Sequence, residues 1–289
     1  MKKLFQKDVI EFIKSLNYDN LLLNTKKIIP SLNIDIFIPE EKLAIECVDI
    51  LHHSEVNGQK SKNYHLNKTL ACKEKGIRLI HIFENEWVNK QEIVKHIIKM
   101  ILDKSENKIF ARKCKLRELS SKEARDFFDT NHLQGYCRGS VYLGLFYNGE
   151  LISSTVFGKS RFRENEYELI RYANKLGYRV FYSMPRFIKH IQQMNVCSKI
   201  ISYCDLRYFV ASGYKKANFE EIGISPPNYF YFSKSKPLIL MNRIHFQKHK
   251  LKNKLKKFDP NLSEWKNMKL NKYDRIFDCG NLKLEYEFR

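Results

Sequence analysis

The chain has 289 residues, 43% of them hydrophobic, and 52 Lys or Arg against 32 Asp or Glu give a formal net charge of +20. This apolar content can build real cores, which excludes global disorder. Neither an apolar run of about 18 residues nor an apolar stretch after the basic amino terminus is present, so a membrane span and secretion are not expected.

The first part of the chain reads as a small α/β unit. Glu11 lies beside the apolar stripe of the opening helix, and the stretch through Asn24 and Pro30 reads as a loop. The predicted elements are a helix at 6–16, a hairpin of strands at 34–39 and 42–48, a helix at 60–75, a strand at 77–83 and a helix at 90–104.

A polar stretch at residues 103–112 predicts a domain boundary, with domains at 1–106 and 109–289. In the second part, Asn148-Gly149 between two alternating runs is a strong hairpin signal. The predicted elements are a hairpin at 141–159, a strand at 179–182, a helix at 184–194, a strand at 199–205 and a strand at 228–232.

Charge and cysteine content indicate the partner and the compartment. Residues 1–108 carry 18 basic and 15 acidic side chains, whereas residues 109–289 carry 34 and 17. Such a field attracts polyanions, so double-stranded DNA is the expected partner of the second part; a coding bias toward lysine would not explain the clustering. Seven cysteines without a CxxC pair favour reduced thiols in the cytoplasm.

Two acids mark the tips of the predicted first hairpin. Asp35 and Glu46 are separated by 11 positions, which a hairpin can bring side by side. Converging carboxylates can hold Mg²⁺ or Mn²⁺, which neutralises charge and activates water in phosphodiester hydrolysis. His53 is suited to proton transfer near neutral pH. The alternative is that each acid is a solvated turn residue and that the histidine is an ordinary core or surface side chain.

The stretches "NIDIFIPEEKLAIECVDILHHSE" and "KNYHLNKTLACKEKGIRLIHIFENEW" resemble the PD-(D/E)XK nuclease superfamily. The similarity is to its branch of very-short-patch repair (Vsr-like) endonucleases and phage homing endonucleases with an EDxHD core. It implies a phage-encoded protein that acts in a bacterial cytoplasm. By this resemblance, the metal ligands are Asp35, Glu46 and Glu11, and the other catalytic candidates are His53, His65 and Lys68. Val48 replaces the usual lysine, so the proton-transfer residue stays open among the last three.

Basic residues gather in two places in the second part. Nine Lys or Arg occur at 234–257 without an intervening acid, and "GKSRFREN" follows a predicted strand. Phosphate contact is the functional interpretation, and a solvated helix face is the alternative. The predicted DNA-binding residues are Lys159, Arg161, Arg163, Arg243, Lys248, Lys250, Lys252, Lys254, Lys256 and Lys257.

The second part also looks like a GNAT acyltransferase fold, through its strand-rich stretch followed by helix and strand. Acetyl transfer needs a glycine-rich helix start for the coenzyme pyrophosphate, but the corresponding place reads "FYSMPRF". We therefore expect a GNAT-like fold used for DNA recognition.

The predicted fold class is α/β, with an amino-terminal restriction-endonuclease-like core and a GNAT-like α+β second domain. The predicted function is a magnesium- or manganese-dependent DNA endonuclease of phage homing type, a hydrolase. Two alternatives stay open, namely an acyltransferase with an accessory domain and a DNA-binding protein with a decayed nuclease core.

Overall fold

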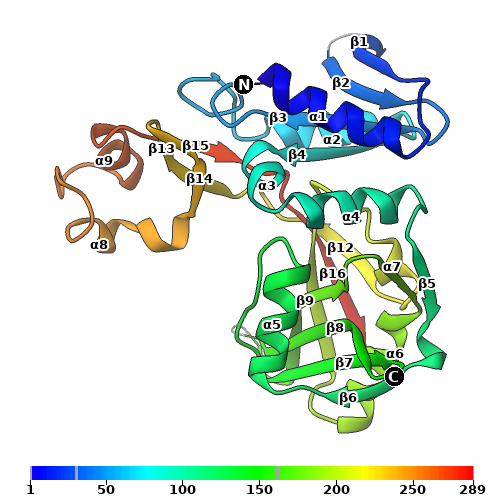
Figure 1. Cartoon of the computed structure of the whole chain (residues 1–289). Helices are drawn as coiled ribbons and strands as arrows, with labels where there is room; N and C mark the ends of the chain where they lie inside the picture. The colour runs from blue at the N-terminus through cyan, green and yellow to red at the C-terminus, as the bar shows by residue number, and fades with distance from the viewer. Residues whose placement is uncertain (1, 30–31, 161–162, 289) are drawn as a thin grey trace. The chain divides into compact units, whose positions relative to one another are not determined.

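The computed structural model describes residues 2–29, 32–160 and 163–288, which form two compact units (Figure 1). The division differs from the single boundary at residues 106–109 expected from the sequence, because the chain passes between the units several times. Unit 1 comprises Met1–Asn89, Leu206–Tyr208 and Pro226–Gly280, and unit 2 comprises Lys90–Asp205, Phe209–Ser225 and Asn281–Arg289.

Unit 1 is built on a mixed four-stranded sheet. Its strands, in spatial order, are β1 (Leu22–Ile29), β2 (Leu32–Ile38), β3 (Leu43–Val48) and β4 (Arg78–Phe83). The first two pairings are antiparallel and the third is parallel. Strand β1 occupies the stretch expected to be a loop, because an edge strand exposes its polar side chains and so lacks a clean apolar alternation.

Three helices accompany this sheet, namely α1 (Lys2–Ser15), α2 (Tyr64–Glu74) and α3 (Glu84–Asn89). In α2, residues at i, i+3, i+4 and i+7 are buried, so one face of the helix is turned inward although three of its four residues are polar. These residues are His65, Lys68, Thr69 and Cys72. Cys72 joins a hydrophobic cluster with Ile34 and Leu79, which fixes the helix to the sheet.

The segment Pro226–Gly280, called the basic lobe below, completes unit 1. Its elements are β13 (Tyr229–Ser233), β14 (Lys236–Asn242), η2 (Arg243–Phe246), α8 (Lys248–Leu251), α9 (Glu264–Leu270) and β15 (Tyr273–Phe277). The three strands form an antiparallel sheet in the order β14-β13-β15 (Figure 1). Phe232 and Ile276 pack on Val48, Ile50 and Phe83, so the lobe shares its core with the ends of β3 and β4.

Unit 2 contains a seven-stranded sheet. In spatial order it consists of β12 (Glu220–Ile224), β16 (Asn281–Glu287), β11 (Lys199–Asp205), β9 (Glu166–Asn174), β8 (Glu150–Lys159), β7 (Val141–Tyr147) and β6 (Lys115–Glu118). Strands β9 and β11 are parallel and the other neighbours are antiparallel. Asn148 and Gly149 both have positive φ, as the hairpin predicted from this dipeptide requires.

The remaining elements of unit 2 are α4 (Gln91–Ile101), η1 (Ala111–Lys113), α5 (Ser121–Asn131), α6 (Ser183–Met194), α7 (Ser212–Lys215) and a parallel ribbon of β5 (Asn107–Phe110) and β10 (Tyr178–Phe181). Helix α5 begins with a capping box between Ser120 and Glu123 and packs Phe127 and Phe128 against β8 and β9. The fold class is mixed α/β. None of the helices within the described residues has the length and hydropathy of a membrane span.

Candidate functional site

A buried polar cluster lies between α2 and the strands β2 and β3 of unit 1. The ammonium of Lys68 contacts the Glu46 carboxylate and donates a second hydrogen bond to the carbonyl of Asn33. Both charged side chains are almost fully buried, with exposed fractions of 2% and 3%. Because a buried charge is stable only when it is paired, the contact compensates the two charges of Lys68 and Glu46.

Asp35 lies next to Glu46 across the β2–β3 hairpin. The antiparallel register pairs Ile36 with Ile45, which puts the two acids at neighbouring positions. Asp35 is buried, and its Oδ2 accepts a hydrogen bond of 2.9 Å from the main-chain N–H of Cys47. One oxygen of each acid is thus engaged by a donor of the protein.

Three histidines continue the cluster. His53 Nε2 lies 3.9 Å from Glu46 Oε1, and its ring stacks on His65 with centroids 5.2 Å apart. His65 in turn meets His81 edge-on at 5.1 Å, and Thr69 Oγ1 lies 2.8 Å from His81 Nε2. Burial, reinforced by the positive charge of Lys68, lowers the pKa of His65 to about 3, and burial also holds the pKa of His81 well below its ordinary value. These two imidazoles are therefore neutral at physiological pH.

Glu11 lies outside this cluster. Its side chain is 63% exposed on α1 and lies 3.7 Å from Lys7, one helical turn earlier. The predicted metal-ligand set of Glu11, Asp35 and Glu46 is therefore not assembled, and the ammonium of Lys68 supplies the positive charge expected from an ion. Within the described residues, no group of three or more His, Cys, Asp or Glu side chains is placed to hold a metal.

The basic lobe carries 13 Lys or Arg and 4 Asp or Glu. Most of its predicted DNA-binding residues are exposed, namely Arg243, Lys248, Lys252, Lys254, Lys256 and Lys257. Lys250 is half-buried and donates a hydrogen bond to the carbonyl of Ile244. Of the residues in "GKSRFREN", Lys159 is exposed at the end of β8 and Arg163 is 70% exposed, 4.0 Å from Glu166. Arg161 lies outside the described residues.

The acids of the lobe are engaged by neutral donors. Glu264 accepts hydrogen bonds from the hydroxyls of Tyr229 and Tyr231, and Asp259 accepts one from the main-chain N–H of Asn261. The lobe's ion pair in the described residues joins Arg275 to Glu55, and its described lysines form none. Within the described residues, the exposed lysines of the lobe are therefore not paired with carboxylates.

Asp274 and Asp278 are the other two acids of the lobe. Asp274 accepts hydrogen bonds from the amides of Val56 and Asn57 and from the Ser54 hydroxyl, and Asp278 accepts from the amides of Asn228 and Gly280. Asp274, which was not among the predicted site residues, connects the loop after His53 to the lobe. Its donors are more than 200 positions away, so no local pattern could have revealed them.

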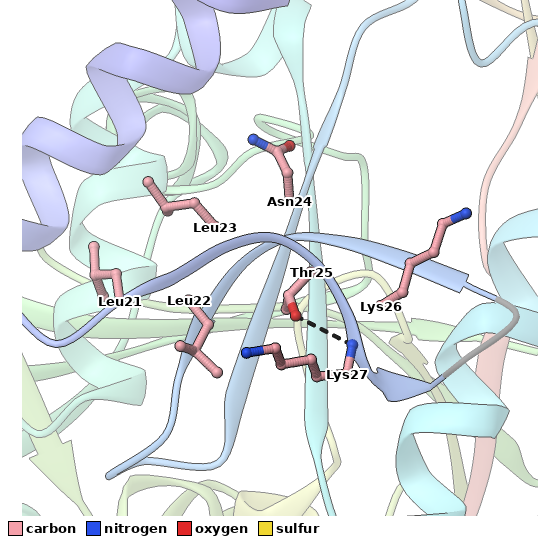
Figure 2. Close-up of a pocket in the computed structure, with 7 residues that line it drawn as sticks. All are labelled: Leu21, Leu22, Leu23, Asn24, Thr25, Lys26 and Lys27. Carbon is pink, nitrogen blue, oxygen red and sulfur yellow. Dashed lines mark hydrogen bonds between the residues drawn. The ribbon is translucent and has the colours of Figure 1, made fainter.

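A surface hollow beside β1 has no comparable chemistry. Figure 2 shows that it is lined by seven consecutive residues, from Leu21 to Lys27, with Thr25 Oγ1 accepting a hydrogen bond of 3.1 Å from the amide of Lys27. A binding site usually gathers polar groups from separate elements. This hollow is lined by a single stretch of chain and gathers no polar groups from other elements, so it is not a candidate site.

Comparison with known proteins gave matches only among solved structures; no family model and no curated protein matches the chain. An acetyltransferase from Bacillus subtilis in complex with CoA is 13% identical, with a TM-score of 0.34, covering 61% of this chain and 100% of that one. The ribosomal-protein-S18-alanine N-acetyltransferase from Escherichia coli is 11% identical, with a TM-score of 0.34 and coverages of 60% and 93%. A GNAT family acetyltransferase from Elizabethkingia anophelis with acetyl-CoA bound is 11% identical, with a TM-score of 0.32 and coverages of 61% and 99%.

The prediction of a metal-dependent DNA endonuclease is wrong. The similar structures are acetyltransferases and not hydrolases, and two of them are complexes with CoA or acetyl-CoA, whereas the expected cofactor was magnesium or manganese. In the described residues, Lys68 contacts Glu46, and no group of three or more His, Cys, Asp or Glu side chains is placed to hold a metal ion. The GNAT-like part of the expectation agrees with these neighbours, and the PD-(D/E)XK part has no support among them. At these identities and TM-scores, the similarity assigns no ligand and no reaction to this chain.

Proposed function

We propose that the chain is a DNA-binding protein that holds the phosphate backbone of double-stranded DNA with its basic lobe. The observation that carries the proposal is the combination of exposed lysines with carboxylates that are already hydrogen-bonded to neutral donors. Lysines without carboxylate partners attract phosphates and release the counterions condensed on DNA. Within this proposal the buried cluster of Glu46 and Lys68 has a structural role, since it attaches α2 to the sheet.

Four lysines provide the test, because they follow one another closely and are all exposed, namely Lys252, Lys254, Lys256 and Lys257. We expect their joint replacement by Gln to weaken binding to a duplex of about 30 base pairs and to lower the slope of log affinity against log salt by about 4, measured by fluorescence anisotropy between about 50 and 200 mM salt.

The control removes the same charge from unit 1 outside the lobe. Gln is placed at four exposed lysines of α1, α2 and the adjoining loops, namely Lys14, Lys62, Lys73 and Lys75. Because the proposal assigns the phosphate contacts to the lobe, this variant should keep nearly the whole salt slope. Equal losses in the two variants would mean that net charge alone drives association and would contradict the assignment.

An acyltransferase is the second candidate, favoured by the way β9 and β11 part. Their parallel register ends at Leu169 and Ser202, although β9 continues to Asn174 and β11 to Asp205. A strand edge left outside a ladder can pair with an extended, amide-bearing chain, as acyl-CoA possesses. We place this function second because no glycine lies at the start of α6, where a backbone must close on the pyrophosphate. It predicts saturable binding of acetyl-CoA in calorimetric titration.

A further inference from the structure

The parallel ribbon of β5 and β10 in unit 2 carries aromatic and basic side chains on one face. The register pairs Lys108 with Arg179 and Phe110 with Phe181. Since side chains alternate along a strand, these four residues share a face of the ribbon, and Ile109 and Val180 point to the other. Val180 is buried and Phe110 is 41% exposed, so the aromatic and basic face is the outer one.

Tyr182 extends this aromatic surface beyond the end of β10. Its ring is 62% exposed and lies nearly parallel to that of Phe110, at 18° with centroids 6.3 Å apart. Phe110 also packs against Phe181 at 5.3 Å. Three aromatic rings from two segments of the chain thus meet at the surface, where burial of apolar area does not account for them.

The backbone of Tyr182 is in the left-handed region, with φ of +59°. A side chain there costs about 1–2 kcal/mol compared with a right-handed conformation, a cost that glycine would avoid. A large aromatic residue at a strained and exposed position is a candidate for a role in binding.

Cations surround the three rings. The guanidinium of Arg112 lies 5.5 Å from the centre of Phe110, and that of Arg179 lies 5.0 Å from Phe181. Two acids lie beside the ribbon: Asp103 forms ion pairs with Lys108 and Arg179, and Glu106 forms one with Lys99. The surface therefore combines aromatic faces with positive charge and neutralised acids.

We propose that the aromatic surface of Phe110, Phe181 and Tyr182 stacks unpaired bases of a nucleic acid, with Arg112 beside them for the phosphates. Every base has a face that can stack on an aromatic ring, and stacking with adjacent cations is how proteins hold single strands without sequence preference. The inference deepens the proposed function, on which it rests: the protein would engage DNA in which some bases are unpaired, besides holding duplex backbone with the basic lobe.

The test uses the full chain and an oligothymidine of about 15 nucleotides, compared with the same strand made abasic at its centre. The wild type should bind the complete strand at least about fivefold more tightly than the abasic one, and Tyr182→Ala should remove this difference, while Tyr182→Phe keeps it. Tyr203→Ala is the matched control, since Tyr203 is another exposed tyrosine of unit 2, at 43%.

Tyr182→Gly separates binding from folding, since glycine relieves the left-handed backbone while it removes the ring. We expect this variant to have a melting temperature at or above that of the wild type and to lose the preference for the complete strand. Equal binding of complete and abasic strands by the wild type would overturn the inference. So would Tyr182-dependent binding to phosphatidylglycerol vesicles without any preference for complete strands, because it would assign the surface to a membrane.

The two proposals fail separately. If the wild type binds complete and abasic strands equally but keeps the lysine-dependent salt slope on duplex DNA, only the inference about Tyr182 is contradicted. If replacing the lobe lysines changes neither the affinity for duplex DNA nor its salt slope, the proposed function is contradicted, whatever the result with oligothymidine.

Discussion

The ion pair of Lys68 and Glu46 is the residue-scale feature on which the interior of unit 1 depends. Removing one partner leaves the other charge buried without compensation, which costs about 3–5 kcal/mol. We therefore expect Lys68→Met to lower the free energy of unfolding by about 3 kcal/mol in urea titration.

Two further variants make this expectation specific. Lys73→Met changes an exposed lysine of the same helix and should alter stability by no more than about 0.5 kcal/mol. Combining Lys68→Met with Glu46→Leu should recover part of the loss, because an apolar pair can replace a buried ion pair at little cost. A single variant as stable as the wild type would show that the two charges do not depend on each other.

His65 makes stability depend on pH. Its pKa is lowered to about 3 in the folded chain, whereas an unfolded chain has a histidine pKa of about 6.5. Between these values the unfolded state binds a proton that the folded state does not. As far as His65 is concerned, the free energy of unfolding is therefore highest above about pH 6.5 and decreases as the pH falls toward 3.

His65→Gln should reduce the dependence of unfolding free energy on pH in this window by up to about 1.4 kcal/mol per pH unit, as measured by urea titrations at several pH values. His245→Gln is the control, since His245 is exposed on η2. The same steep dependence in the His65 variant would mean that other groups carry it, such as His81 in the same cluster.

Sequence patterns also had a limit at this scale. The hairpin expectation places Asp35 beside Glu46, and the structure puts them at neighbouring positions. The sequence could not tell which positive group lies beside the Glu46 carboxylate, because a lysine from α2 and a metal ion can both neutralise it. Whether the lysine reaches the carboxylate depends on the distance between α2 and the sheet, and that distance depends on the packing of residues such as Cys72.

At the scale of elements, apolar periodicity identified the buried strands and most helices, and it failed at the edges. Strand β1 exposes polar side chains, and the four-residue strand β5 was not predicted, because its partner β10, which was predicted at 179–182, lies far along the chain. Such strands form because a neighbour supplies their hydrogen bonds, and a neighbour far along the chain leaves no local signal.

The basic lobe leads to a prediction about truncation. A fragment of residues 1–106 keeps Val48, Ile50 and Phe83 but loses Phe232 and Ile276, which cover them. We expect this fragment to expose apolar surface and to lack a cooperative urea transition, since burial of large side chains contributes about 1.5–3 kcal/mol each. Dye binding and circular dichroism would measure this; a cooperative transition like that of the whole chain would contradict the shared core.

At the scale of the whole molecule, composition predicted a nucleic-acid partner but not the way in which the chain divides. The charge excess after residue 109 falls partly in unit 2 and partly in the lobe that completes unit 1. The boundary expected from the polar stretch at 103–112 could not reveal this, because a segment that returns to an earlier unit looks like any other part of the chain.

This interleaving has a consequence for synthesis. Residues up to Asn89 leave the ribosome long before Pro226–Gly280, the segment that closes their core. At about 5–20 residues per second, the interval is roughly 10–40 s. During that time Phe232 and Ile276 do not yet cover Val48 and Phe83, so the nascent protein offers chaperones an apolar surface that is buried once Pro226–Gly280 has been synthesised.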